Sequence, residues 1–229
     1  GHRLITSGRA PQVSGTIPAM SSLPARWTPS PTARAAGESA TVRYTNPTII
    51  QPGEAPQKPL APYAVALSRV LRETFPFLTG AGLARASDRR HQVGQRRDVH
   101  EEGRALDLAV PRAVRGTTQG DDVADWIVTH ADLLGVQGVV WRGTDWFPER
   151  SMRWRARSTE TDHDDHLHVE VSAEAGRWPE SEAERRVQAA LAGSAAAETG
   201  ADHSTALAVA GGAAAGLLAG AAVVLARRR

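Results

Sequence analysis

Apolar residues in the central part of the chain first follow the spacing of an amphipathic helix. Between Pro62 and Phe75 they recur every three or four positions, which predicts a helix that begins near the proline. A second stretch with this spacing starts at Asp121 and Asp122, acidic residues that suit a helix N-terminus. It stops before Gly135, and glycine is common just after a helix C-terminus.

Three further segments have the pattern of strands. Residues 105–110 alternate between branched apolar side chains and small or acidic ones. Residues 166–171 place leucine and valine on one face and two histidines and a glutamate on the other. Residues 136–141 form an apolar run of the length of a buried strand. Because strands and helices mix without regular β-α-β alternation, the pattern favours an α+β domain over residues 61–180.

The regions on either side of this domain have different patterns. Ten of the 14 prolines fall by the start of the first predicted helix, so residues 1–60 are predicted to be a disordered linker or stalk, with a short strand around 41–44 docking on the domain. Residues 181–203 are expected to be a linker, of which 182–191 could form a surface helix. Residues 204–226 carry no charge and precede three arginines, which predicts a transmembrane helix with a cytoplasmic end.

Composition narrows the chemistry that this chain can perform. The 229 residues include no cysteine, which excludes disulfides, thiolate zinc sites and cysteine nucleophiles. The formal net charge is only +2, and no aromatic-studded basic stripe is present, so nucleic acid is not an expected partner. The sequence starts at Gly1 without an apolar signal region, so an export signal is expected to have been cleaved or to lie outside it.

Two clusters contain the residues that suit a metal site. His100 precedes Asp107, which lies on a predicted strand, and Gly103 lets the chain turn between them. The second cluster, residues 163–168, holds three histidines. Zinc binds imidazole and carboxylate groups, and a catalytic zinc site uses three protein ligands. A lone surface histidine usually has no function, but this grouping predicts metal binding.

The motif His100-Glu-Glu-Gly-Arg-Ala-Leu-Asp107, followed by His166-Leu-His168, resembles a known family. It is similar to the zinc peptidases that group lysostaphin, the D-alanyl-D-alanine carboxypeptidases and the Hedgehog signalling domain. More narrowly, Gly-Arg-Ala-Leu-Asp-Leu and His-Asp-Asp-His-Leu-His-Val resemble the carboxypeptidase-like domains of actinobacterial cell-wall proteins. The resemblance covers about residues 60–175. It implies a small antiparallel sheet that carries a zinc site and is flanked by helices, as in the Hedgehog and D-alanyl-D-alanine peptidase group.

The resemblance also implies a function and a role for each residue. The expected activity is hydrolysis of peptide bonds in peptidoglycan stem peptides, as a D,D-carboxypeptidase or an endopeptidase. Asp165 would act as general base and then as acid, and His166 would stabilise the oxyanion or share the proton transfer. His163 matches an additional histidine of some endopeptidases. The zinc ligands implied by position are His100, Asp107 and His168.

This chain departs from that family in two respects. The family often has a serine where this chain has Asp98. Its carboxypeptidases grip the substrate carboxylate with an arginine, and Arg89 and Arg90 lie upstream of the first ligand. A solvated charge run is an equal or better interpretation of that pair, so the substrate-binding residues stay unassigned.

The residues before the apolar tail resemble a sorting signal. Ala196-Ala-Glu-Thr199-Gly200 is similar to the Leu-Ala-x-Thr-Gly motif of sortase substrates, with alanine at the leading position. If a sortase, as a further partner, cleaved between Thr199 and Gly200, the domain would be linked to the wall. If not, the tail would hold it in the membrane. Both outcomes predict an extracytoplasmic domain beside its peptidoglycan substrate.

Two other functions remain open at the level of sequence. A non-catalytic zinc module that binds wall peptides would need the ligands but not Asp165 and His166. A plain adhesin or stalk would need no metal at all. The presence of both a ligand set and proton-transfer residues favours the enzyme.

Overall fold

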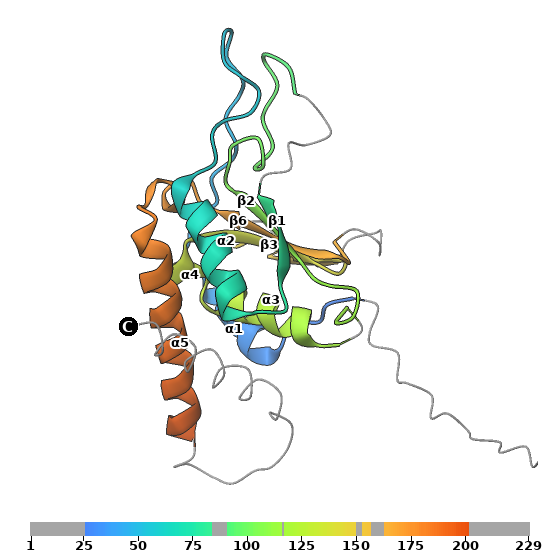
Figure 1. Ribbon diagram of the computed structural model, residues 1–229, viewed down its shortest axis with the longest axis vertical. Coiled ribbons are helices and arrows are strands. Elements are labelled where there is room, and N and C mark those ends of the chain that lie inside the picture. Colours follow the sequence, from blue (N-terminus) through green and yellow to red (C-terminus); the bar gives the residue numbers. More distant parts are fainter. Residues whose placement is uncertain (1–25, 84–90, 116, 150–152, 157–162, 202–229) are drawn as a thin grey trace, which may run out of the picture.

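The computed structural model describes residues 26–83, 91–115, 117–149, 153–156 and 163–201. They form an α+β domain around a six-stranded sheet in the order β1-β2-β6-β3-β4-β5 (Figure 1). All five strand pairs are antiparallel. The strands are β1 (Thr79–Leu83), β2 (Ala105–Ala109), β3 (Val136–Trp141), β4 (Thr144–Trp146), β5 (Trp154–Ala156) and β6 (His166–Val171).

The helices pack against one face of this sheet. Helix α2 contacts β1 and β2, α3 contacts β3, α1 lies against α3, and α5 lies beside α2 (Figure 1). Apolar side chains of α2 and α3 share one core with those of β2, β3 and β6. The helices are α1 (Pro31–Ser39), α2 (Pro62–Thr74), α3 (Gln119–Thr129), α4 (Ala131–Leu134) and α5 (Ser181–Ala201), with a 3₁₀ turn η1 at Ala175–Arg177.

The elements predicted from hydrophobic periodicity are confirmed. Strands β2, β3 and β6 and helix α2 lie where the pattern placed them. The second predicted helix is divided at His130, the C-cap of α3 and N-cap of α4. Gly135 ends α4 in the left-handed conformation, with φ +66°. Strands β1, β4 and β5 were not predicted, because β4 and β5 have only three residues each and β1, Thr-Gly-Ala-Gly-Leu, has a single large apolar residue.

The linker predicted for residues 1–60 is wrong from residue 26 onward. Trp27 is 1% exposed, and its indole N–H donates to Asp125 on α3 over 2.9 Å. Residues 41 and 42 are not a strand, yet they dock as expected, because the backbone N–H groups of Thr41 and Val42 donate to Asp132 over 2.8 and 2.7 Å. The prolines from residue 26 onward therefore belong to a segment that packs on the domain, and one of them, Pro31, begins α1. Residues 1–25 lie outside the described part of the chain.

Helix α5 shows that residues 181–201 are not a loose linker. Ala183 and Val187 are fully buried in the core, and the Arg186 guanidinium lies 3.5 Å from the centre of the Trp178 ring. The helix expected at residues 182–191 is confirmed, and α5 continues beyond it through the sorting-signal segment, residues 196–200. The predicted span at 204–226 lies outside the described residues, among which no helix has the length and hydrophobicity to cross a membrane.

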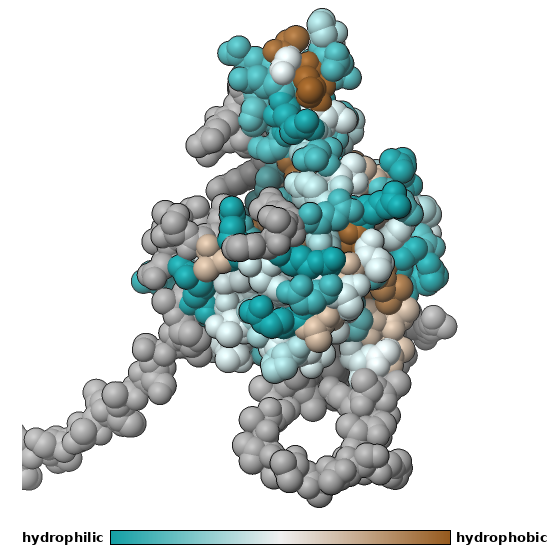
Figure 2. All heavy atoms as spheres, turned by 180° about the vertical axis from the view of Figure 1, so that it is seen from behind, coloured by the Kyte–Doolittle hydropathy of each residue, from teal (hydrophilic) through white to brown (hydrophobic). Residues whose placement is uncertain are grey.

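Two segments outside the helices and strands, residues 45–60 and 91–103, lie side by side and protrude from the domain (Figure 1). Arg97 is buried between them and donates to the carbonyl oxygens of Pro56 and Ala55 over 2.9 and 2.8 Å. The end of the protrusion shows apolar surface in Figure 2, in agreement with the exposure of Ile49 and Val93, 43% and 57%. The base of the protrusion carries His100.

Candidate metal centre

The β2–β6 pairing brings Asp107 and His168 together. These residues are direct partners in the antiparallel register, so their side chains leave the sheet on the same face. The alternate residues Leu106, Leu108 and Leu167 point the other way and are at most 1% exposed in the core. The apolar pattern that fixes the register thus also fixes the distance between the acid and the imidazole.

His100 reaches the same point from a tight turn at the base of the protrusion. Asp98 Oδ1 accepts from the Glu101 N–H over 2.7 Å, and Glu101 Oε2 accepts from the Asp98 N–H over 2.9 Å. This reciprocal arrangement has the chemistry of a capping box. Gly103 closes the turn at φ +72°, where a Cβ would lie 2.3 Å from the Pro59 carbonyl oxygen. Asp98 therefore holds the turn that presents His100.

Three ligand atoms from these residues converge within 4.8 Å of one another. His100 Nε2 lies 3.2 Å from His168 Nδ1 and 3.5 Å from Asp107 Oδ1. His168 Nδ1 lies 3.1 Å from Asp107 Oδ1. Two imidazole nitrogens and a carboxylate oxygen, held close on partly buried side chains, match the donor set of a catalytic zinc site. The structure thus brings the three predicted ligands together.

The remaining nitrogen of His168 is held by a carboxylate on the same strand. His168 Nε2 donates to Glu170 Oε1 over 3.2 Å, which leaves Nδ1 for a metal. Glu170 Oε2 accepts from Gln137 Nε2 over 3.3 Å, and Gln137 Oε1 accepts from the Thr45 N–H over 2.9 Å. The N-terminal segment, residues 26–60, therefore helps to orient the predicted metal ligand His168 through Gln137 and Glu170. Sequence reasoning missed this role of Glu170, although the His-x-Glu spacing on one strand face signals it.

The ionisation of the ligands reflects their mutual contacts. Burial opposes the charge on His168, but hydrogen bonds to Asp107 and Glu170 outweigh it and raise its pKa to about 9. Burial and the charge of His168 lower the pKa of His100. Burial would raise the pKa of Asp107, but the hydrogen bond from His168 and the neighbouring imidazoles lower it overall. Without metal, the centre is therefore an imidazolium between two carboxylates.

The residues with predicted proton-transfer roles lie beside the ligands. His166 Nδ1 donates to Asp165 Oδ1 over 2.6 Å, and its Nε2 lies 3.7 Å from Asp107 Oδ1. The hydrogen bond from His166 is the main cause that lowers the pKa of Asp165. The Asp165 side chain is 60% exposed, so its free oxygen is open to solvent and to a substrate.

His163 also faces this group. Its ring centre lies 4.7 Å from that of His166 and 5.5 Å from that of His168. Its φ is +68°, a conformation that costs energy in a residue other than glycine and that is concentrated at functional sites. Its carbonyl oxygen accepts from the Arg142 N–H over 3.1 Å, which ties the loop to the end of β3. All six predicted site residues thus form one cluster, while Arg89 and Arg90 lie outside the described residues.

A second group of potential ligands, His91, Asp98 and Glu101, lies nearby. The Glu101 carboxylate is 4% exposed and contacts His91 Nδ1 over 2.7 Å. It also accepts from the backbone N–H groups of Asp98 and His91. These bonds occupy both carboxylate oxygens, so this group acts as the scaffold of the His100 turn.

Comparisons with known proteins give one match. The family described as VldE, C-terminal domain, matches residues 57–168. The matched span starts just before α2 and includes every residue of the centre from His100 to His168. No curated protein and no solved structure matches the chain.

Proposed function

We propose that this chain is a cell-surface zinc metallopeptidase that hydrolyses peptide bonds in peptidoglycan stem peptides, as a D,D-carboxypeptidase or an endopeptidase. The observation that carries the proposal is the convergence of His100, Asp107 and His168 with the Asp165–His166 pair beside them. The resemblance of the motifs to the lysostaphin, carboxypeptidase and Hedgehog group supplies the substrate class. The span matched by the family described as VldE, C-terminal domain, residues 57–168, includes these five residues, but that description names neither zinc nor a peptidase.

The donor set fits zinc, which would be held by His100, Asp107 and His168. Bound zinc supplies Lewis acidity, which polarises a peptide carbonyl and lowers the pKa of water to about 7. Asp165 then receives the proton of the attacking water through its exposed oxygen and returns it to the leaving amine. The carboxylate is ionised at neutral pH, and the hydrogen bond from His166, which is the main cause of its lowered pKa, also orients it.

His166 and Glu170 prepare the other groups for this reaction. His166 lies between Asp165 and Asp107, so it can share the transferred proton or donate a hydrogen bond to the oxyanion. Glu170 holds His168 in the orientation that directs Nδ1 at the centre. His163 packs on both imidazoles and limits the movement of each ring.

The C-terminal residues support a location next to the proposed substrate. The apolar run 204–226 and the arginines after it suit a membrane span, and the Ala-Ala-Glu-Thr-Gly segment suits a sortase. Both features would hold the domain outside the cell, in contact with the wall.

The proposal is tested by metal analysis and by release of amino groups from purified peptidoglycan. The wild-type domain should retain about one zinc and release amino groups. His168→Ala should lose zinc and activity, and Asp165→Asn should keep zinc but lose activity by about 100- to 10,000-fold. Asp164→Asn, a change of an exposed neighbouring carboxylate, is the matched control and should behave as wild type.

Two results would contradict the enzyme. Retained zinc with no amino-group release by the wild-type domain would indicate a non-catalytic wall-binding module. Full activity in Asp165→Asn or His168→Ala would refute the site. Mass analysis of products from defined muropeptides then distinguishes a carboxypeptidase, which releases a terminal residue, from an endopeptidase.

A further inference from the structure

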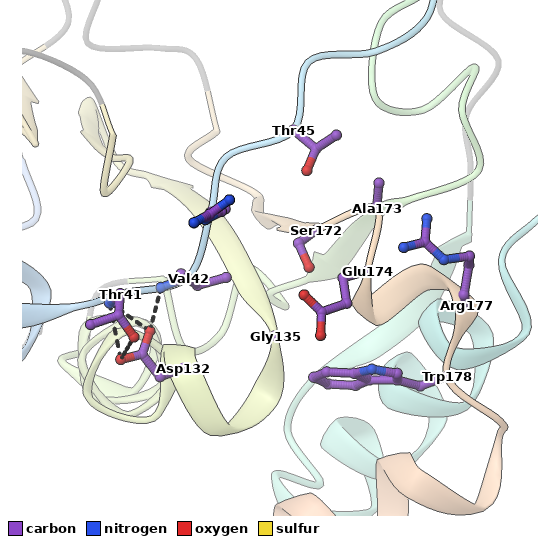
Figure 3. A pocket seen from close by; sticks show the side chains of 11 residues that line it. Thr41, Val42, Thr45, Asp132, Gly135, Ser172, Ala173, Glu174, Arg177 and Trp178 are labelled. Atoms are coloured by element: carbon purple, nitrogen blue, oxygen red, sulfur yellow. Dashed lines mark hydrogen bonds between the residues drawn. The ribbon is translucent and has the colours of Figure 1, made fainter.

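A pocket of about 460 Å³ lies at the end of β6 that is away from the metal centre. It is formed between the docked N-terminal segment and the turn that follows β6 (Figure 3). From His168 to Ser172 the strand spans four residues, or about 13 Å of extended chain, so the pocket is separate from the ligands. The residues that give it chemical character are Arg43, Thr45, Ser172, Glu174, Arg177 and Trp178.

Three of the four charged residues that line this pocket are not engaged by other side chains of the described part of the chain. Among the described residues, the side chains of Arg43, Glu174 and Arg177 form no hydrogen bond or ion pair, and all three are exposed. Figure 3 shows the Glu174 carboxylate and the Arg177 guanidinium on the same side of the pocket, with Glu174 above the Trp178 ring. Opposite charges are thus available on one wall without neutralising each other.

The other acid of the pocket is already used. Both oxygens of Asp132 accept hydrogen bonds from Thr41, and one also accepts from the Val42 N–H. Glu174 is therefore the carboxylate left for a ligand, against two guanidinium groups. The pocket also contains the hydroxyls of Thr45 and Ser172, and Ser172 Oγ already accepts from the Ala175 N–H over 3.1 Å.

Trp178 gives the pocket a firm apolar side. Its ring is fixed by Arg186 at 3.5 Å and by an edge contact with Tyr63, whose ring centre is 5.1 Å away. Gly135 lies so close that a Cβ there would be 2.8 Å from the indole. An indole held in this way can pack against small apolar groups without losing side-chain entropy on binding.

From these features we propose that the pocket binds a short peptide with a free carboxylate and a free ammonium group. Arg177 and Arg43 pair with the carboxylate, Glu174 pairs with the ammonium group, and small side chains such as the methyl of alanine lie against Trp178. The volume is suited to a few residues. The site requires no metal and is independent of the proposed hydrolysis, so it is an accessory peptide site about one strand length from the centre.

The test uses alanyl-alanine as the probe and the indole N–H signal of Trp178 as the readout. The titration is carried out by nuclear magnetic resonance on the full domain carrying His168→Ala, which removes binding at the metal centre and hydrolysis of the probe. Trp178→Phe assigns the signal. A saturable shift is expected with a Kd of about 1 mM, the range of weak binding for a ligand this small.

Variants and capped probes then identify the groups that bind. Arg177→Gln and Glu174→Gln should each weaken binding about tenfold, as should N-acetylation and C-amidation of the probe. Arg69→Gln, which changes an exposed arginine on α2, should leave the Kd unchanged. The proposal would be overturned if the Trp178 signal showed no saturable shift. It would also be overturned if Arg177→Gln and Glu174→Gln bound the probe as tightly as the protein with the unchanged pocket. Equal affinity for the capped probes would overturn it too, because the charges would then play no part.

Discussion

The two faces of the β2–β6 ladder carry opposite kinds of side chain on the same backbone. One face holds Leu106, Leu108 and Val169, all at most 1% exposed in the core under the helices. The other holds His168 and Glu170, which are also buried, at 7% exposed each, but ionisable. Burial of the first set stabilises the fold, whereas burial of the second set has a cost that mutual hydrogen bonds must offset.

This difference teaches how the fold positions the centre. Successive side chains of a strand alternate between faces, so a slip of one residue would exchange the two sets. The helix-facing residues forbid that slip, since it would place Asp107 and His168 in the apolar core. The stability of one face and the geometry of the other are therefore set by a single register, and they can be separated by mutation.

The largest effect on stability is expected from the apolar face. Leu108→Ala removes a side chain that is 0% exposed, and such a cavity lowers the free energy of unfolding by about 2–5 kcal/mol. Urea denaturation measures the change. Val93→Ala, at a site 57% exposed, is the control and should change it by less than about 0.5 kcal/mol. Zinc affinity of the folded variant should stay near the wild-type value; a large loss would mean that the two faces are not separable.

The polar face should give the metal-free protein a distinctive pH dependence. Because the pKa of His168 is raised to about 9 in the folded state, against about 6.5 in an unfolded chain, its contribution is fully present below pH 6.5. It is lost as the pH rises through 9, by at most about 3 kcal/mol. Urea denaturation at about pH 6 and pH 9.5, after a chelator has removed any metal, tests this. The His168→Gln variant should lack the decline in the free energy of unfolding between these two pH values. Zinc affinity should instead increase as the pH rises, because the metal must displace the proton from His168.

The sequence was sufficient to predict the elements with strong periodicity and the cluster they carry. Strand β6 alternates cleanly, so its two faces and the position of His168 followed directly. The grouping of histidines and an aspartate predicted metal binding, and the resemblance to the zinc peptidases implied His100, Asp107 and His168 as the ligands. Strand β4 was missed since three residues, all buried, have no alternation to read.

The N-terminal segment could not be predicted for a different reason. Its proline-rich composition resembles that of disordered chains, but the free energy that orders it comes from distant partners. Trp27 contacts Asp125 and Thr45 contacts Gln137, pairs separated by more than ninety positions. No local pattern reports such contacts, and the support of Glu170 by Gln137 was hidden for the same reason.

A smaller effect should follow from weakening the support of a ligand. Glu170→Gln keeps the shape of the side chain but removes the charge that holds His168. Loss of such a partner lowers metal affinity by about 10- to 100-fold, which competition with a zinc chelator measures. Glu180→Gln, at an exposed position outside the sheet, is the matched control. Unchanged affinity in Glu170→Gln would show that the strand register alone orients the ligand.

The smallest effect should come from the contact between the N-terminal segment and α4. Asp132→Asn removes the charge that accepts the N–H groups of Thr41 and Val42, at a surface where such bonds contribute about 1 kcal/mol. Urea denaturation should show that loss, and Asp164→Asn should show none. Zinc affinity should change by less than about twofold, because Thr45 still bonds Gln137 further along the segment. If Asp132→Asn weakens zinc binding as much as Glu170→Gln does, the N-terminal segment acts as one unit with the polar face, and the separation between fold stability and the centre fails there.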